Sequence, residues 1–393
     1  MKELCMKQVL RNERGMALAL AIVAMVIVGA LVAGALFSGT QEQRMAESSR
    51  FQQQSFGVAE AGASELIRTW NTTTFNGRRA YPQDSAAAIA WTNAASNTGS
   101  YNGSVFKLAD NLYLFDVTGR DTMSRANRLQ GGGFNQRLGV LTRIKPLQVD
   151  IQASLTTGNS DQLAGQATVD GNDHIPPGWL TCGPTGAALA GVRSDKGTTV
   201  DTTGNASVRG SPAVLIDSTV TDSTFTKFGS INYAQLSASA NVTVPGQNFS
   251  NSIGPVVNGA GQCDLTVQTN WGDGVNPLSP CGTYFPIVHI TGDATIDGVQ
   301  GQGILLIDGS LSVQGGFQWF GITIIQGQLK TSGGGSTDAH FWGATMVHDS
   351  VSFGTNTLSG HANINYSQCA VLKVLNATAK GALMRSRSWV QLY

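Results

Sequence analysis

The sequence predicts an α+β chain that is mainly β: a long N-terminal transmembrane helix, a small antiparallel sheet and a right-handed parallel β-helix. Three observations support this prediction. Residues 16–37 contain neither a charged side chain nor a proline, and a helix of that length can cross a bilayer. Glycine accounts for 48 of the 393 residues, well above its usual share of about 7%. A nine-residue apolar pattern also recurs near the C-terminus, as it does in coils that stack on one another.

The predicted helix extends well beyond the membrane-spanning run. That run is longer than the apolar region of a cleaved signal peptide, which has roughly 7–15 residues. No proline occurs before Pro82, and an apolar stripe continues at three- and four-residue steps after the polar residues that follow Phe37. The stripe consists of Phe56, Ala59, Ala63, Leu66, Ile67 and Trp70. We therefore expect a leader over residues 1–15 and one helix over residues 16–70, whose outer half docks on a folded domain.

Charge indicates the orientation and excludes one class of partner. Basic residues precede the apolar run at four positions of the leader, whereas only Arg44 and Arg50 follow it closely. The positive-inside rule then places the leader in the cytoplasm and the rest of the chain outside it. The 25 basic and 25 acidic residues cancel, so the chain lacks the basic field expected of a nucleic-acid-binding protein.

The N-terminal residues carry a family resemblance. A short basic leader ends at Gly15, an uncharged helix begins at Met16, and Gln-Arg-Met-Ala at 43–46 and Phe-Gly-Val-Ala-Glu-Ala-Gly at 56–62 follow. This region resembles the N-terminal region of PilX-like minor pilins. The resemblance implies cleavage after Gly15 by a prepilin peptidase and N-methylation of Met16. It further implies packing of the helix with other pilin-like subunits, contact with the pilus assembly platform, and a place in the inner membrane and then in an extracellular pilus.

One position departs from the general pilin pattern. The fifth residue after the expected cleavage is Glu in major pilins and Leu20 here. A carboxylate in hydrocarbon is costly unless it meets a partner, such as the terminal amine of a neighbouring subunit. Leu20 removes both the cost and the partner, which favours a minor position at a fibre tip. Ala30 and Gly34 form a small-xxx-small step for close helix packing, or they are simply part of an Ala-rich anchor.

Residues 71–148 are expected to form a linker and a small antiparallel β region. Residues 71–104 are rich in Asn, Thr, Ser and Gly, as in a surface linker. Residues 112–117 and 138–144 are largely apolar and read as antiparallel strands on either side of a loop that contains Gly131–Gly133. The helix stripe would rest on these strands.

Residues 149–393 are expected to form a Gly-rich solenoid. The pattern at 303–311 recurs at 321–329 and 343–351, and more loosely at 286–294. Because one coil cannot bury its apolar row alone, such repeats stack into parallel ladders. A β-sandwich with fortuitous similarity is the alternative.

The repeat also predicts where individual side chains lie. Strand residues alternate between the two faces of a sheet. We expect the interior to contain Ile304, Leu306, Ile324 and Leu329, with Asp308 and Gln326 at turns. The last residues, 385–393, are expected to close the solenoid or to pair with its edge.

The cysteines favour disulfides over metal. Cys5 lies in the leader, and an even number remains beyond the membrane: Cys182, Cys263, Cys281 and Cys369. An oxidising compartment permits pairing, and the sequence leaves all three connectivities open. No Cys-x-x-Cys spacing is present, so we expect no metal site and no cofactor.

Candidate catalytic side chains have simpler interpretations. The carboxylates of Asp293 and Asp308 adjoin glycines, where Asx turns form. Other candidates are Asp297, His340, His348 and His361, and the histidines lack the spacing of a ligand pair. Asp349 takes the turn position that Gly309 has in its own repeat. The aromatic residues Phe317, Trp319, Phe320, Phe341 and Trp342 favour a hydrophobic cluster under a loop over a sugar platform.

The sequence thus predicts a non-enzymatic minor pilin-like protein that acts in type IV pilus or pseudopilus assembly. Adhesion at the fibre tip, to a surface or a glycan ligand, would extend that role. Two alternatives stay open: a membrane-tethered β-helix enzyme that acts on polysaccharide, and an unprocessed binding module of the cell envelope.

Overall fold

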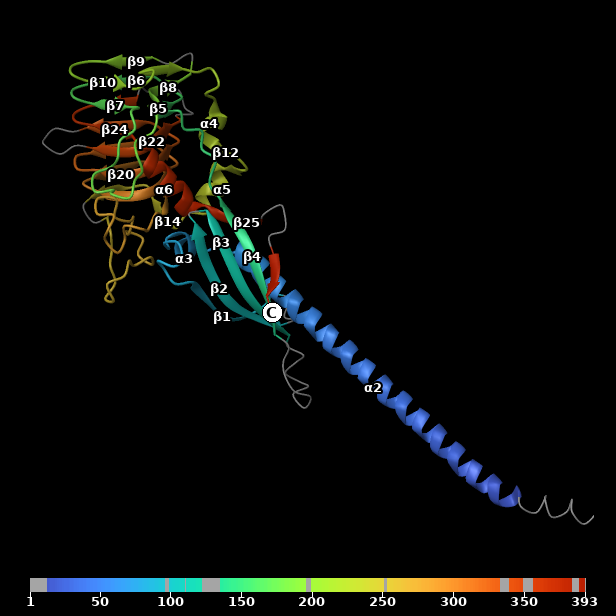
Figure 1. Cartoon of the computed structure of the whole chain (residues 1–393). Coiled ribbons are helices and arrows are strands. Elements are labelled where there is room, and N and C mark those ends of the chain that lie inside the picture. Colours follow the sequence, from blue (N-terminus) through green and yellow to red (C-terminus); the bar gives the residue numbers. More distant parts are fainter. Residues whose placement is uncertain are drawn as a thin grey trace, which may run out of the picture.

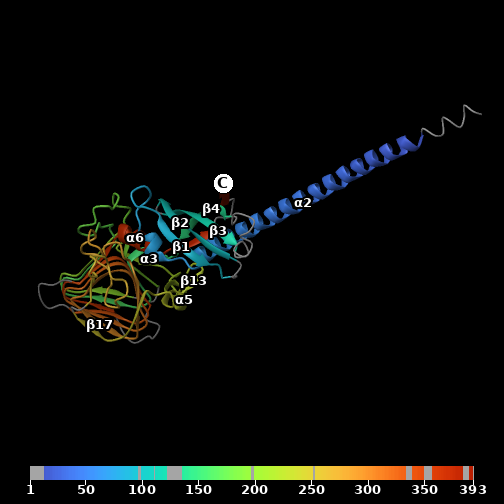
Figure 2. The same ribbon diagram turned by 90° about the horizontal axis from the view of Figure 1, so that it is seen from below.

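The computed structural model describes residues 13–95, 99–109, 111–121, 135–195, 199–250, 253–332, 339–348, 356–383 and 389–392. A long N-terminal apolar helix is followed by mainly β structure, as the sequence predicts (Figure 1). An antiparallel sheet lies between this helix and a larger unit of parallel strands, and Figure 2 shows the same order from below. Most of the predicted leader, the loop glycines Gly131–Gly133, and Asp349 lie outside the described residues.

Helix α2 spans Glu13–Arg68 without interruption. Its sequence has no proline and is rich in Ala, Leu, Gln and Glu, which are good helix formers. At about 1.5 Å per residue its 56 residues span roughly 84 Å, more than twice the thickness of a hydrocarbon core. The predicted helix is therefore confirmed, except that it ends two residues before Trp70.

The antiparallel sheet is built from both ends of the chain. Its strands are β1 (Ala87–Asn93), β2 (Gly99–Ala109), β3 (Leu112–Asp121), β4 (Asn135–Lys145), β25 (Lys380–Leu383) and β26 (Trp389–Leu392). The predicted strands at 112–117 and 138–144 are parts of β3 and β4, and they pair antiparallel as expected. Both C-terminal strands pair with β4. The prediction that the last residues close the solenoid is therefore wrong, and β25 and β26 do not belong to the predicted unit 149–393. The expected linker contains helix α3 (Thr72–Asn76), β1 and part of β2.

The outer half of α2 packs on this sheet through the predicted stripe. Ala59, Ala63, Ile67 and Trp70 are buried against core residues of β2, β3 and β4, with Phe56 and Leu66 partly buried beside them. Close approach requires Gly119 in β3, because a Cβ there would lie 2.3 Å from the backbone nitrogen of Ala59. The sheet therefore fixes the direction in which the helix leaves the domain.

The parallel unit comprises β5–β11 and β14–β24. Its strands are β5 (Ala153–Thr157), β6 (Asp161–Leu163), β7 (Thr168–Asp170), β8 (Ala190–Ser194), β9 (Val200–Thr202), β10 (Ser207–Arg209), β11 (Val214–Ile216), β14 (Val242–Pro245), β15 (Asn248–Ser250), β16 (Ile287–Thr291), β17 (Ala294–Asp297), β18 (Gln300–Ile307), β19 (Leu311–Gln314), β20 (Gln318–Ile325), β21 (Leu329–Ser332), β22 (His340–Val347), β23 (Asn356–Leu358) and β24 (Asn363–Tyr366). Successive turns of the chain add parallel neighbours to two sheets. The stacked strands between β16 and β22 confirm the repeat, while the right hand of the coil stays a prediction.

The coils do not follow one another in chain order. From β5 the chain advances through β8 to β11 at one end of the stack. It then crosses to the other end through α4 (Asp222–Thr226), β12 (Lys227–Phe228), β13 (Ile231–Asn232) and α5 (Tyr233–Ser237), and resumes at β14. The coils from β14 onward return until β22 pairs with β5. Two segments of the chain thus form one stack and meet at a seam between β22 and β5.

Glycines form the bend within the long strands of the repeat. Gly303, Gly321 and Gly343 pair with one another in successive coils and have φ values of +114°, +141° and +140°. A Cβ at Gly321 would lie 2.2 Å from the carbonyl oxygen of Gly303. These positions therefore require glycine both for backbone conformation and for the contact between coils.

The repeat has two apolar faces, which corrects the predicted interior. The interior core contains Leu305, Ile307, Ile325 and Leu329. Ile304, Leu306 and Ile324 point the other way and are buried beneath α6 (Gln368–Thr378) and the α4–α5 segment. The prediction is correct for Leu329 and wrong for the other three residues. Asp308 and Gln326 lie in the bends after β18 and β20, as expected.

The four cysteines beyond the membrane helix form two disulfides. Cys182 pairs with Cys369 across 187 positions and ties the segment after β7 to α6. Cys263 pairs with Cys281 across 18 positions, within the long excursion between β15 and β16. The structure thus selects one of the three connectivities that the sequence left open.

Candidate functional site

The most exposed apolar surface of the described chain lies on the free part of α2. Every described side chain from Ala17 to Glu47 is exposed, and docking on the sheet begins near Ser55, which is fully buried. By length and composition α2 can cross a membrane, and none of its most apolar window is buried within the protein. We call residues 17–47 the free helix.

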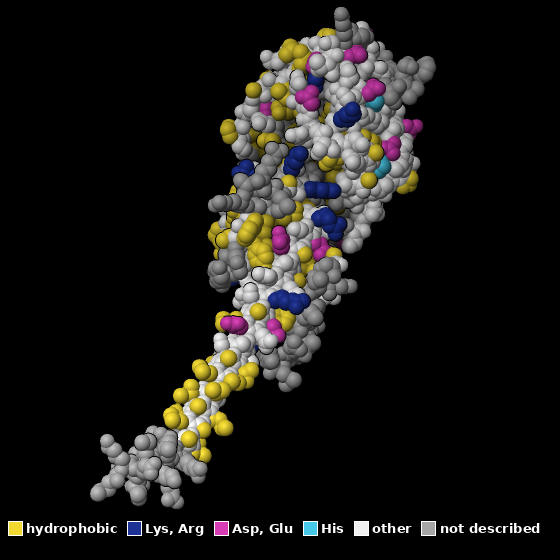
Figure 3. Space-filling view, turned by 90° about the vertical axis from the view of Figure 1, so that its right-hand side faces the viewer, with side chains coloured by type: hydrophobic (Ala, Val, Ile, Leu, Met, Phe, Trp, Pro, Cys, Tyr) yellow, Lys and Arg dark blue, Asp and Glu magenta, His cyan; other side chains and the backbone are white. Residues whose placement is uncertain are grey.

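The free helix carries a continuous sleeve of large apolar side chains (Figure 3). They are each more than half exposed: Leu18, Leu20, Ile22, Val23, Met25, Val26, Ile27, Val28, Leu31, Val32, Leu36 and Phe37. Burying one such side chain is worth about 1.5–3 kcal/mol, so leaving the whole sleeve in water is strongly unfavourable. Lipid or the helices of other proteins must cover it.

The predicted assembly and processing residues all lie on α2. Leu20 is 66% exposed, and no atom lies within 4 Å of a Cβ placed on Gly34. Ala30 is also exposed, so these three positions are open to a partner on the isolated chain. Gly15 and Met16 lie in the first described turns of the helix. Cleavage between them stays a prediction.

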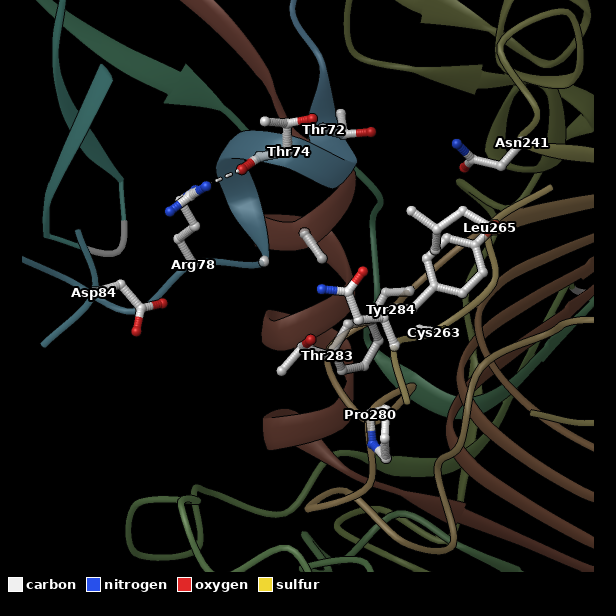
Figure 4. A pocket seen from close by; sticks show the side chains of 14 residues that line it. Thr72, Thr74, Arg78, Asp84, Asn241, Cys263, Leu265, Pro280, Thr283 and Tyr284 are labelled. Atoms are coloured by element: carbon white, nitrogen blue, oxygen red, sulfur yellow. Dashed lines mark hydrogen bonds between the residues drawn. The ribbon is translucent and has the colours of Figure 1, made fainter. Parts of the chain in front are cut away.

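A second candidate is the cleft where the antiparallel sheet meets the parallel unit (Figure 4). It has a volume of about 480 Å³, with Thr72, Arg78 and Asp84 on one side and Asn241 and Tyr284 on the other. The Arg78 side chain donates to the carbonyl oxygens of Thr74, at 3.1 Å, and Ser85, at 2.9 Å. Arg78 and Asp84 both form hydrogen bonds with nearby backbone groups. The two side chains are therefore not arranged for acid–base chemistry.

The local environment sets the protonation of the carboxyl and the phenol groups in this cleft. A hydrogen bond from the backbone N–H of Arg79 lowers the pKa of Asp84. Burial raises the pKa of Tyr284 to about 12. At neutral pH the carboxylate is therefore ionised and the phenol is protonated, so neither group is poised to exchange a proton.

The carboxylates and histidines considered from the sequence hold structural positions. Asp293 accepts a hydrogen bond from the backbone of Ser310 in the next coil, at 2.7 Å, and not the local bond expected of an Asx turn. Asp308 accepts from the Tyr233 hydroxyl at 2.9 Å, and its Oδ1 lies 2.9 Å from His289 Nε2. Burial, reinforced by this carboxylate, raises the pKa of Tyr233.

His348 forms a second contact of the same kind. Its ring nitrogens lie 3.0 Å from Gln326 and 3.2 Å from Asp222 of α4. Together with the contact of Asp308 to Tyr233 of α5, it attaches the α4–α5 segment to the stack. Asp297 ends β17, His340 begins β22 and His361 lies before β24, so these candidates are spread over different strands and turns. Within the described ranges no group of His, Cys, Asp or Glu is arranged to hold a metal.

The aromatic residues of the repeat divide between two cores. Phe317, Trp319 and Phe341 lie in the interior. Phe320 and Trp342 point outward and stack with ring centroids 6.5 Å apart, and Trp179 stacks on Phe320 at 5.7 Å. Both ring faces of Phe320 are thereby covered by other aromatic rings. This favours a role in hydrophobic packing and not a role as a stacking platform for a sugar. The sequence pattern did not identify Trp179 as part of this aromatic cluster, because its segment contains no repeat.

No protein-family model and no characterised protein sequence matches the chain. Among solved structures, the chain is similar to that of the competence-associated pilin ComZ from Thermus thermophilus. The similarity covers 87% of this chain and 97% of that chain, at 12% sequence identity and a TM-score of 0.24. A likeness this distant carries no argument, so any assignment must rest on the geometry described above.

Proposed function

We propose that this protein is a PilX-like minor pilin, without enzymatic activity, whose free helix inserts first in the inner membrane and then among the helices of other pilin-like subunits. One observation carries the proposal: the apolar sleeve of α2 is uncovered, yet the same helix continues without a break into the core of a folded domain. A rigid connection of this kind transmits the position of the helix to the domain. A flexible linker after a simple anchor would not.

Two features support a low-copy position at the fibre tip. Leu20 lacks the carboxylate that would pair with the amine of a neighbouring subunit, so the helix is poorly suited to a site beneath another copy. The parallel unit spans residues 153–366 and lies far from the free helix (Figure 1). So large a unit is difficult to repeat along a thin fibre, but it is well placed to contact surfaces when carried at an end.

The proposal is tested by placing charge in the sleeve. The double variant Ala30→Glu/Gly34→Glu puts two carboxylates in hydrocarbon, each unfavourable by about 2.5 kcal/mol or more near the bilayer centre. We expect loss of incorporation into fibres, measured by immunoblotting of sheared pili, and loss of pilus-dependent attachment. Gln41→Glu/Gln52→Glu adds the same charge to exposed polar positions of α2 and should assemble normally. Normal fibre incorporation of the Ala30/Gly34 variant would refute the proposal.

Processing is tested separately by mass spectrometry of the mature N-terminus. We expect a chain that begins with N-methylated Met16, and an unprocessed product when Gly15→Leu blocks the peptidase. An intact leader in the wild-type protein would instead favour the unprocessed binding module. Asp293→Ala and Asp308→Ala should leave attachment unchanged, whereas loss of a polysaccharide-cleaving activity in them would favour the enzyme alternative.

A further inference from the structure

Three cationic side chains gather on the outer face of the antiparallel sheet, next to the parallel unit. Lys380 of β25 lies directly opposite Lys145 of β4 in the antiparallel pairing. Arg143 lies two residues before Lys145, so the two side chains share a face. That face points away from α2, because the intervening Ile144 lies in the core beneath the helix. All three cationic residues are exposed, and Figure 3 shows Lys and Arg side chains gathered on this side of the molecule.

The lysine pair is unfavourable on the chain by itself. Like charges directly opposite in an antiparallel pair repel and destabilise a sheet. Among the described residues, none of the three cations forms an ion pair with a carboxylate, and Asp116 on the neighbouring strand is engaged by Arg137. An anion bound between the two lysines would convert the repulsion into attraction.

The two lysines also line a cleft rather than an open surface. The cleft has a volume of about 280 Å³ and contains Ser230, Gln235 and Thr378 beside them. Through Lys380 it adjoins a space of about 440 Å³ that includes Asn71 and Asn241. Neither lining contains an Asp or Glu among the described residues. The electrostatic character of the cleft is therefore set by its cations.

The amide side chains of the cleft and of the adjoining space present donors. The side-chain oxygens of Asn71, Gln235 and Asn241 each accept a backbone N–H, at 2.9, 3.0 and 2.9 Å. Because those oxygens are occupied, the NH₂ groups are the part of each amide available to a ligand. The partly exposed apolar side chains of Leu147 and Ile231 complete the lining, whereas the lining residues Leu236 and Ile287 are buried. The cleft thus combines two ammonium groups, several neutral donors and small apolar surfaces.

We propose that this cleft binds an acidic oligosaccharide, with a sugar carboxylate between Lys145 and Lys380. The neutral donors suit sugar hydroxyls, and the apolar side chains suit the C–H face of a sugar ring. Single-stranded nucleic acid fits less well, because base stacking needs exposed aromatic rings and the one aromatic residue of this lining, Trp70, is buried. The inference extends the adhesive part of the proposed function and does not depend on whether the chain enters a fibre.

The test measures binding by titration calorimetry on the full-length protein in detergent micelles. The probe is a tetramer of galacturonic acid, with a tetramer of galactose as the neutral control and inorganic phosphate as the control for a free anion. We expect the acidic tetramer to bind and its affinity to fall as salt rises, because exposed charges are screened. Lys145→Gln/Lys380→Gln should weaken binding by about tenfold or more, since charge-assisted hydrogen bonds are lost.

Matched controls separate this site from non-specific charge. Lys330→Gln removes an exposed lysine of β21 elsewhere on the parallel unit and should leave affinity unchanged. The double variant should melt at the same or a slightly higher temperature, because it relieves the lysine repulsion. Equal affinity of the double variant, equal binding of the neutral tetramer, or phosphate binding as tight as that of the tetramer would each overturn the proposal. Fibre incorporation of the double variant, measured in parallel, tests assembly independently.

Discussion

The glycine at the bend of each repeat gives a sharp test of the stacked coils. Gly321 has φ of +141°, and a Cβ there would lie 2.2 Å from the carbonyl oxygen of Gly303 and 2.7 Å from a methyl group of Val374 in α6. A side chain at such a φ costs on the order of 1–3 kcal/mol. The contact with Gly303 is with backbone, so it can be relieved only by moving one coil away from the next. We therefore expect Gly321→Ala to destabilise the parallel unit by about 3 kcal/mol or more.

The assay is thermal unfolding of the full-length protein, followed by circular dichroism with the disulfides intact. A loss of about 3 kcal/mol corresponds to a Tm lower by roughly 6–12 °C for a unit of this size. Gly259→Ala is the matched control, because a Cβ there meets no atom within 4 Å and the backbone is not in the left-handed region. The control should be neutral or slightly stabilising. A Tm for Gly321→Ala equal to that of the control would refute the proposed contact between coils.

Three further predictions concern polar and covalent contacts of the parallel unit. Hydrogen bonds from Thr219 and Arg193 lower the pKa of Asp217 to about 2. Since the unfolded pKa is higher, the associated stability is present above about pH 4 and is lost as pH falls towards 2. An acid titration of Tm should therefore be shallower for Asp217→Asn. Arg193 is 1% exposed and forms ion pairs with Asp150 and Asp217. Arg193→Met leaves both carboxylates without this partner and should lower Tm by several degrees. An unchanged Tm would contradict this. Replacing Cys263 and Cys281 by Ser should cost about 3 kcal/mol in the chain-entropy model, and free thiols in the unreduced, denatured wild type would exclude that disulfide.

The residues of the repeat that point into the interior could not be predicted from the sequence pattern. Alternation identifies which residues share a face, but it distinguishes inside from outside only if one face meets water. In β18 both faces are buried, since Leu305 and Ile307 lie in the interior while Ile304 and Leu306 lie beneath α6 and the α4–α5 segment. All four residues are apolar, so no sequence signal separates them.

The cation pair of the proposed ligand site was likewise invisible in the sequence. Lys145 and Lys380 are separated by more than half of the chain; Lys145 ends the 11-residue strand β4 and Lys380 begins the four-residue strand β25. They meet because β25 returns to the antiparallel sheet after the whole parallel unit has been completed. Sheet pairing of this kind depends on contacts distant in sequence, which local patterns do not encode.

The sequence by itself determined the features that depend on local composition and spacing. These are the uncovered helix of residues 16–37, the docking stripe around Ala63, the strands on which it rests, and the repeated coils near the C-terminus. Only the tertiary structure decided the disulfide pairs, the seam between β22 and β5, the return of β25 and β26 to the first sheet, and the cleft between the two β units. The physical reason is that hydrophobic periodicity specifies which face of an element is buried, whereas the partner that buries it is selected by packing of the whole chain.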